Sequence, residues 1–249
     1  MTARATSLWR DPLLWCGVGW VALVLLMGRA KPLFALIFPS LARPLYALDS
    51  FPALAIGHLA LVGASSGIAA IVGVAAGIFV TRAAGAEFRQ MVEVIATIGQ
   101  TFPPVAVLAV AVPLIGFGFE PALIALALYG LLPVVENTIS GIGTVPAGAR
   151  EAARGIGMGE AAILWQIELP LAAPVIIAGI RVSTIINIGT AAIASTVGAR
   201  TLGSPIIIGL NGANIAYVLQ GAVLVGLLAV VVDLGFGRVQ RMLERWRRA

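Results

Sequence analysis

The sequence predicts an all-α integral membrane protein with about six transmembrane helices. Its 249 residues are 60% hydrophobic and 11% charged, and the mean hydropathy is +1.03. An ordinary soluble domain is about 45–50% apolar and about 25% charged. A water-soluble monomer of this length could not bury so many apolar side chains. The composition therefore argues against a soluble enzyme, a nucleic-acid-binding domain and a disordered protein.

Six segments have the length and apolar character of a bilayer-spanning helix, which needs about 20 mainly apolar residues. The third contains Pro103-Pro104, which predicts a kink or a break. The second contains two G-x-x-x-G patterns, at 63–67 and 73–77, which allow helix backbones to approach closely in lipid. These patterns fit either an interface beside a transport pathway or ordinary bundle packing. The six segments are 12–28, 54–80, 91–115, 121–142, 171–196 and 214–236.

The distribution of Lys and Arg predicts that both termini lie in the cytoplasm. With six spans and the N-terminus inside, the cytoplasmic segments hold 11 basic residues and the outer segments hold 4. The loop 29–49 is then expected along the outer membrane surface, and the basic tail 238–248 near anionic headgroups. The first apolar run lacks the small-residue exit of a cleaved signal peptide, so we expect it to be retained.

The residue inventory argues against nucleotide and metal chemistry in this chain. The one lysine, Lys31, precedes a proline, so the G-K-[ST] of a P-loop is missing. Single Cys16 and single His58 make neither an intrachain disulfide nor a cysteine- or histidine-rich metal site. A G-x-G-x-x-A match at 157–162 has no preceding strand, which a dinucleotide site requires.

A serine hydrolase within the membrane is the remaining enzymatic interpretation. It would pair His58 with Ser65 or Ser66, which lie seven and eight positions later. That separation is about two helical turns, too long for a hydrogen bond on one straight helix. His58 is better explained as a polar residue at a helix interface, and no catalytic residue is expected.

The most informative polar segment is 147–170, between the fourth and fifth spans. Good helix formers at 149–154 are followed by three glycines, at 155, 157 and 159, which end the first helical stretch. A second helical stretch is expected at 160–168, and Pro170 opens the next span. Two short helices bent over a glycine turn could engage a soluble partner, although a solvated loop would fit the same pattern.

This segment matches, without a gap, the EAA-x3-G-x9-I-x-L-P signature of permease subunits from binding-protein-dependent ABC importers, and the chain resembles that family. The resemblance implies the type I ABC importer permease (MetI-like) fold, with residues 1–249 forming one permease domain. It also implies that 147–170 is the EAA coupling loop, which docks on a cytoplasmic ATPase. ATP and Mg would be bound by that ATPase, and no cofactor by this chain. The signature positions are Glu151, Ala152, Ala153, Gly157, Ile167, Leu169 and Pro170.

Other segments resemble the osmoprotectant branch of the family, the permeases for glycine betaine, carnitine and choline. The Yeh-type betaine permeases are similar at 85–89 and 185–190 as well. Many osmoprotectant permeases carry Arg-Asn-Thr where this chain has Glu-Asn-Thr at 136–138, a reversal of charge. The branch resemblance rests on 99–108, 129–134, 169–181 and 197–203.

The resemblance implies an ATP-driven importer of glycine betaine or a related quaternary-ammonium osmolyte in the bacterial inner membrane. Its implied partners are an ATPase dimer, a second permease subunit (identical or paralogous), a periplasmic binding protein and membrane lipid, with no nucleic acid. The alternatives are an ATP-independent secondary transporter or channel and a non-transporting scaffold. An ion-coupled carrier usually has several acidic or His residues inside its spans, and neither alternative gives the EAA loop a purpose.

Four residues are predicted to border the translocation path. Thr101 and Phe102 lie at the proline break, where exposed backbone carbonyls must be covered by protein or water. Asn187 and Thr190 are three positions apart and share a helix face. The alternative role for these polar groups is hydrogen bonding between helices.

Glu136 and Arg181 are predicted to form a charge pair inside the bundle, directly or through water. Their depths from the cytoplasmic face overlap once side-chain reach is included. A lone ion in the membrane interior costs several kcal/mol, so opposite charges at one depth tend to pair. Alternatively, Glu136 reaches the cytoplasmic interface and Arg181 meets backbone carbonyls or the cavity on the ATPase side.

Overall fold

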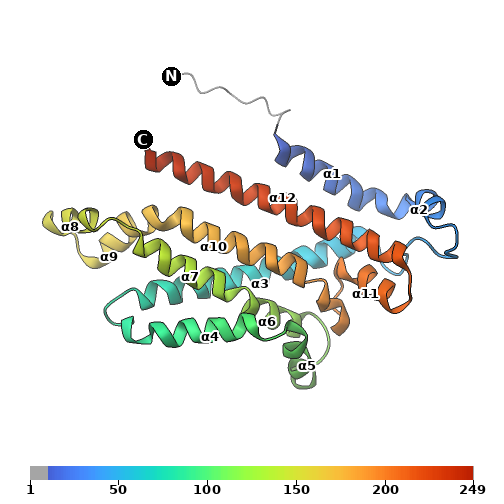
Figure 1. Cartoon of the computed structure of the whole chain (residues 1–249), viewed down its shortest axis with the longest axis horizontal. Helices are drawn as coiled ribbons and strands as arrows, with labels where there is room; N and C mark the ends of the chain where they lie inside the picture. Colours follow the sequence, from blue (N-terminus) through green and yellow to red (C-terminus); the bar gives the residue numbers. More distant parts are fainter. Residues whose placement is uncertain (1–10, 249) are drawn as a thin grey trace. The chain divides into compact units, whose positions relative to one another are not determined.

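Every regular element in the described part of the computed structural model is a helix (Figure 1). The structure describes the backbone of residues 11–248 and the side chains of residues 11–244. The basic residues Arg4 and Arg10, and the side chains at the end of the basic tail, lie outside this part. The helices are α1 (Pro12–Leu26), α2 (Lys31–Ile37), α3 (Phe51–Val80), α4 (Arg89–Thr101), α5 (Pro104–Ile115), α6 (Phe119–Tyr129), α7 (Leu131–Gly143), α8 (Ala147–Gly155), α9 (Glu160–Ile163), α10 (Leu169–Thr190), α11 (Gly203–Asn211) and α12 (Ile215–Arg248).

Five helical segments among the described residues are long and apolar enough to cross a membrane, and a bent pair makes a sixth. This confirms the prediction of about six spans. The sequence-based boundaries agree within about three residues at most ends. The last helix is the largest exception at its C-terminal end, because α12 continues from the predicted span through the basic tail to Arg248.

The bent pair lies where Pro103-Pro104 predicted a break. Helix α4 ends at Thr101, Phe102 adopts an extended conformation with ψ 124°, and the following helix departs at an angle of 90°. The N–H of Phe102 still bonds the carbonyl of Ile98. Neither proline can donate such a bond, and a proline disfavours helical geometry in the residue before it. The sequence-based expectation of a broken third span is confirmed.

The fifth span ends earlier than the predicted Thr196. Helix α10 stops at Thr190, and residues Ile193–Val197 form a separate 3₁₀ turn. The Thr201 hydroxyl donates to the carbonyl of Ala191 at 3.2 Å, and the Ser195 hydroxyl pairs with that of Ser204 at 3.1 Å. Hydroxyl side chains that bond nearby backbone compete with helical hydrogen bonds. The apolar run continues past this point, which is why hydropathy alone overextended the helix.

The contacts between Cα atoms divide the chain into two compact units. Among the described residues, unit 1 comprises 11–63, 107–123 and 188–235, and unit 2 comprises 64–106, 124–187 and 236–248. The helices α3, α5, α6, α10 and α12 each contribute residues to both units. The coupling segment 147–170 belongs to unit 2, together with the ends of the helices that support it.

Unit 1 is held by side chains that reach across to distant backbone groups. Trp20 Nε1 donates to the carbonyl of Leu224 at 2.8 Å, and His58 Nε2 lies 3.1 Å from the carbonyl of Ile188. Burial and the neighbouring Asp49 carboxylate raise the pKa of Tyr46 to about 12, so its hydroxyl stays protonated and donates to Asp49. His58 is fully buried, in agreement with its interpretation as an interface residue rather than a catalytic one.

Unit 2 contains the close helix approach that one of the two G-x-x-x-G patterns predicted. A Cβ atom at Gly73 would lie 2.8 Å from Cβ of Val134, and one at Gly77 would lie 2.6 Å from Cβ of Thr138. Helices α3 and α7 therefore pack backbone to backbone at this pair. The pattern at 63–67 has no such neighbour, because a Cβ at either of its glycines would meet nothing within 4 Å in the described structure.

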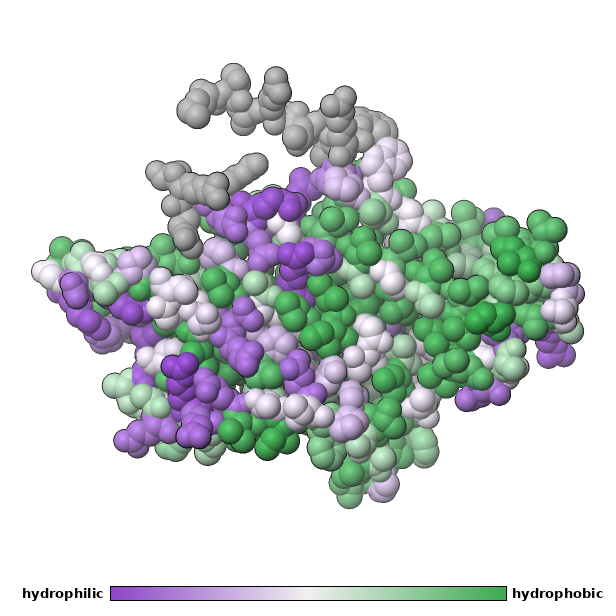
Figure 2. All heavy atoms as spheres, viewed as in Figure 1, coloured by the Kyte–Doolittle hydropathy of each residue, from purple (hydrophilic) through white to green (hydrophobic). Residues whose placement is uncertain are grey.

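Large apolar side chains cover much of the surface, whereas hydrophilic residues gather over the end of unit 2 that carries α8 and α9 (Figure 2). Leu36, Ile71 and Leu114 are between 74% and 79% exposed. A soluble protein rarely exposes contiguous apolar surface on this scale, and a lipid-facing surface requires it. The polar end contains ion pairs formed by Arg82, Arg89 and Arg154 with nearby carboxylates.

Candidate functional site

The first helix of the coupling segment ends in a left-handed glycine, as the sequence predicts. Helix α8 stops at Gly155, and Gly157 has φ +84°. The N–H of Met158 donates to the carbonyl of Ala153 at 3.0 Å, and the N–H of Gly157 donates to the carbonyl of Arg154 at 2.9 Å. These two bonds are the Schellman arrangement, which satisfies the last carbonyls of a helix. The turn between α8 and α9 is thus rigid, and its geometry favours glycine at position 157.

The signature residues divide into exposed and buried positions. Glu151 and Ala152 are exposed on α8, whereas Ala153 is buried against the rest of unit 2. Gly157 and Pro170 are exposed, and Ile167 and Leu169 are half-buried. One side of α8 therefore leaves Glu151 and Ala152 exposed, while Ala153 on another side packs against the unit. The docking role of these seven residues remains a prediction.

The second half of the segment is helical, as predicted, but it contains a π-helical turn. Helix α9 covers Glu160–Ile163, the π turn covers Leu164–Glu168, and α10 begins directly at Leu169. Pro170 therefore lies in the first turn of α10, in the position expected of it. The π turn was not predicted, and π turns are frequent at functional sites.

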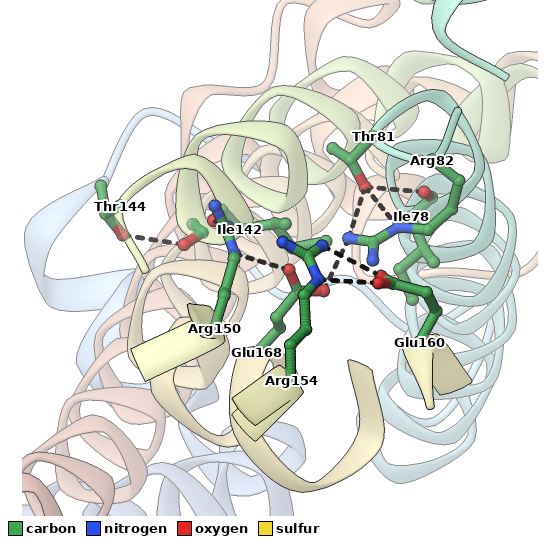
Figure 3. A network of polar contacts seen from close by, with 10 residues as sticks. Ile78, Thr81, Arg82, Ile142, Thr144, Arg150, Arg154, Glu160 and Glu168 are labelled. Carbon is green, nitrogen blue, oxygen red and sulfur yellow. Dashed lines mark hydrogen bonds and ion pairs between the residues drawn. The ribbon is translucent and has the colours of Figure 1, made fainter. Parts of the chain in front are cut away.

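Glu168, at the end of the π turn, is a buried carboxylate held by two arginines (Figure 3). It is 4% exposed. Its Oε2 lies 2.7 Å from Nη2 of Arg82, which follows α3, and its Oε1 lies 2.7 Å from Nε of Arg150 on α8. Arg150 also donates to the carbonyl of Ile142 on α7. We call Arg82, Arg150 and Glu168 the loop clamp, because they join the coupling segment to the ends of α3 and α7.

The loop clamp borders a hollow of about 840 Å³ whose walls include Arg89, Arg154 and Glu160. Arg154 Nε lies 2.9 Å from Oε1 of Glu160, an ion pair within the coupling segment. The hydrogen bond that Arg154 donates to the Glu160 carboxylate raises the pKa of the guanidinium. Both side chains are more than half exposed, so water screens this pair far more than it screens Glu168.

The four predicted path residues differ in their surroundings. Thr101 and Phe102 are exposed at the helix break, and the Thr101 hydroxyl donates to the carbonyl of Thr97. Thr190 is half-buried. Asn187 is fully buried, and its Nδ2 donates to the hydroxyls of Ser65 and Ser66 at 3.3 and 3.1 Å. Asn187 therefore makes the interhelical hydrogen bonds that were the alternative to a path role.

Glu136 and Arg181 each have other neighbours among the described residues, and their pairing, direct or through water, remains a prediction. Arg181 Nη1 donates to Oε1 of Gln240 on α12 at 2.9 Å. Glu136 is exposed and lines a hollow of about 350 Å³ with Arg89 and Glu93. The reason is the direction of α7. The next residue, Asn137, is the one that faces α10, where a Cβ added to Gly179 would meet it at 2.6 Å. Neighbouring helix residues point about 100° apart, so Glu136 is turned away from α10.

Among residues 11–244, no group of three His, Cys, Asp or Glu side chains is placed to hold a metal ion. The loop clamp was not predicted. Its carboxylate lies within a polar segment, where a surface position is the ordinary expectation. The sequence contains one local indication that Glu168 is buried, because Glu168 lies between Ile167 and Leu169 just before a span. A charged residue with apolar neighbours on both sides, at the start of a buried helix, needs a partner.

Comparison with known proteins gives consistent similarities. Residues 73–249 match the family described as "Binding-protein-dependent transport system inner membrane component". The osmoprotectant import permease protein OsmY of Salmonella typhimurium is 44% identical over 176 residues, 71% of this chain and 75% of that protein. The glycine betaine/carnitine/choline transport system permease protein OpuCB of Bacillus subtilis is 42% identical over 179 residues, 71% of this chain and 79% of that protein.

A solved structure is similar in fold. A chain of the MetNI methionine ABC transporter, in an inward-facing conformation, aligns with a TM-score of 0.66. The alignment covers 75% of this chain and 93% of that chain, at 23% sequence identity. This similarity supports the fold alone, and it confirms the MetI-like permease fold that the sequence predicts.

Proposed function

The chain belongs to the family of binding-protein-dependent transport system inner membrane components, and on this premise we propose that it imports glycine betaine or a related quaternary-ammonium osmolyte. Family membership makes it a multi-pass inner-membrane permease subunit that works with an ATPase and a substrate-binding protein. The permease does not itself hydrolyse ATP, and its sequence has no P-loop.

The observation that carries the proposal is the match to osmoprotectant permeases along a chain that also presents a rigid EAA segment. The relatives named for osmoprotectant and for glycine betaine, carnitine and choline each align with 71% of this chain. The segment 147–170 ends its first helix in a fixed glycine turn and exposes Glu151 and Ala152. A rigid segment of this kind transmits movement of a docked ATPase to the helices, where alternating access takes place.

The permease requires only weak recognition of its cargo. Quaternary ammonium groups bind in aromatic cages through cation–π attraction, and in this proposal that recognition belongs to the binding protein. A tight site within the membrane would retain the osmolyte rather than release it. Thr101, Phe102, Asn187 and Thr190 remain the proposed border of the path, with Asn187 acting through its hydrogen bonds to Ser65 and Ser66.

The proposed assembly contains two permease subunits, identical or paralogous, and a cytoplasmic ATPase dimer that binds ATP and Mg. The binding protein delivers substrate on the periplasmic side, and lipid surrounds the helices. Both termini of the permease are proposed to lie in the cytoplasm, on the strength of the 11 basic residues in the cytoplasmic segments against 4 outside. Nucleic acid is not among the proposed partners.

Transport by the reconstituted assembly tests the proposal. The permease, its ATPase and its binding protein would be incorporated into proteoliposomes, and uptake of radiolabelled glycine betaine, carnitine and choline would be measured with and without ATP. We expect uptake of at least one of these compounds to require ATP and the binding protein together. Uptake driven by a sodium or proton gradient without ATP would instead support a secondary transporter.

A further inference from the structure

We propose that Glu168 is a positioning residue that couples the EAA segment to the helix bundle, and that its negative charge is required for this coupling. The inference rests on the proposed function, since coupling has a meaning only if an ATPase docks on the segment. Glu168 is not a signature residue. It lies at the variable position between Ile167 and Leu169.

Burial and direct contact fix the position of the Glu168 carboxylate. Glu168 is 4% exposed, and each of its oxygens has an arginine nitrogen at 2.7 Å. Removing one partner from a buried ion pair leaves an uncompensated charge, which is strongly unfavourable. The carboxylate and its two arginines are therefore held in a single arrangement, and they move as one group.

The two arginines lie in separate parts of the chain. Arg82 follows the end of α3, and Arg150 lies on α8, one position before Glu151. Arg150 is further tied to α7 through the carbonyl of Ile142, and Arg82 donates to the Thr81 hydroxyl at 3.2 Å. The carboxylate, which lies directly before α10, is thus the common partner of Arg82 after the α3 end and of Arg150 on α8, as Figure 3 shows.

The π turn directs Glu168 inward. Ile163 before the turn and Ala172 after it are both buried. Glu168 and Ala172 are four positions apart on one face of the helix. Ile163 is five positions before Glu168, and in an unbroken α-helix these two would lie about 140° apart around the axis. The wider π turn, with its five-residue hydrogen-bond spacing, brings both side chains to the buried side.

Removal of the charge would have a defined effect. Glutamine at 168 keeps the shape of the side chain but leaves two guanidinium groups facing one neutral amide. The like charges of Arg82 and Arg150 would then repel each other across a partly desolvated site, and α8 would be free to move without moving α3 and α10. An ATPase could still bind the exposed face of α8, but its movement would reach the helices less efficiently.

The experiment uses the complete assembly of permease, ATPase and binding protein in lipid nanodiscs and proteoliposomes. Glu168→Gln is compared with wild type and with Glu93→Gln. The control removes a carboxylate from the exposed Arg89–Glu93 pair, outside the coupling segment. The measurements are the amount of ATPase that co-purifies, the stimulation of ATP hydrolysis by substrate-loaded binding protein, and the number of substrates imported per ATP.

For Glu168→Gln we expect normal ATPase co-purification, with imported substrate per ATP reduced by about tenfold, within the usual size of coupling effects. Glu93→Gln should leave this ratio unchanged. A Glu168→Gln complex with an unaltered ratio would overturn the inference, as would a loss of uptake that only parallels a loss of assembled complex. If Glu168→Gln does not assemble, Arg82→Gln decides by the same ratio, because it removes one arm of the clamp at a partly exposed position.

Different results would contradict the proposed function and the role of Glu168. Wild-type complex that shows no ATP-dependent uptake, or that retains no ATPase, contradicts the proposed function. Wild-type complex that couples normally, together with variants that also couple normally, contradicts only the role of Glu168.

Discussion

Arg181 on α10 donates a hydrogen bond from Nη1 to Oε1 of Gln240 on α12, at 2.9 Å. The amide of Gln240 in turn donates from Nε2 to the carbonyl of Pro174 at 3.2 Å. One side chain therefore connects the last long helix to two points of α10 that are nearly two turns apart. The pairing of Arg181 with Glu136, direct or through water, remains a prediction beside this relationship.

The first prediction compares Gln240 with Glu136 as the partner of Arg181. Gln240→Leu should lower the stability of the solubilised permease by about 1 kcal/mol, because a hydrogen bond to a charged group is lost at a half-buried site. Glu136→Gln should change stability by less than about 0.5 kcal/mol, as is usual for an exposed position. Thermal unfolding of the two purified variants measures both effects.

Uptake by the charge-swapped permease gives a further check on the same prediction. We expect Arg181→Glu to impair uptake and the double variant with Glu136→Arg to restore none of it. Recovery of uptake in the double variant would indicate that the two charges act as a pair despite their separate neighbours.

The second prediction concerns Gly157, whose φ of +84° lies in the left-handed region. A β-branched residue there is strained by about 1–2 kcal/mol, and Gly157→Val should distort the turn between α8 and α9. Initial uptake should fall about tenfold or more, while immunoblots of the membrane fraction show normal amounts of permease. Gly157→Asn should retain most uptake, since asparagine tolerates this conformation. Gly155→Val provides the matched control at a glycine without a positive φ.

A third prediction uses the two G-x-x-x-G patterns as each other's controls. Gly77→Ala places a methyl group 2.6 Å from Cβ of Thr138, so α3 and α7 must separate. Overpacking of this kind costs about 1–3 kcal/mol, and the unfolding temperature should fall. Gly67→Ala meets nothing within 4 Å. It should leave the unfolding temperature of the isolated permease the same or slightly higher, because alanine favours helix. Equal losses in both variants would contradict close packing at Gly77.

The fourth prediction tests the proposed path by thiol labelling. Cys16 is the only cysteine, so replacing it with serine gives a background for single-cysteine variants. Thr101→Cys should react with a water-soluble maleimide in at least one state of the transport cycle. Ile71→Cys, 74% exposed on apolar α3, should remain unlabelled, because hydrocarbon excludes the reagent. Protection of Thr101→Cys in the apo, ATP-bound and substrate-loaded states would argue against a path at the proline break.

The positions of the spans could be predicted from the sequence because each depends on composition over about 20 residues. The break at Pro103-Pro104 could also be predicted, since two adjacent residues without N–H groups interrupt a helix locally. The end of α10 at Thr190 was not, because it depends on hydroxyl contacts from Thr201 and Ser204 that lie later in the chain. A hydropathy profile does not predict such contacts.

The candidate site likewise has one feature that the sequence could predict and others that it could not. The glycine turn at 157 could be predicted from residue type, and the structure places it in a left-handed conformation. The loop clamp could not, because Arg82 is about 70 and 90 positions before its neighbours Arg150 and Glu168, and only folding brings them together. The direction of Glu136 likewise follows from the rotation of α7, which depth along the membrane normal does not specify.

Because the coupling segment contains a π turn, the number of its residues affects how α8 is oriented relative to α10. The π turn adds backbone between the exposed surface of α8 and the first turn of α10. Deleting one of its residues would leave an ordinary α-helical turn with Ile163 and Glu168 four positions apart on one face. Deleting one residue from α9 would instead rotate everything before it by about 100° relative to α10. Most substitutions in α9 change only the local surface, whereas an insertion or deletion there changes the direction in which α8 points relative to α10. The fixed spacing between Gly157 and Ile167 therefore sets the direction in which the exposed side of α8, the proposed docking surface, points.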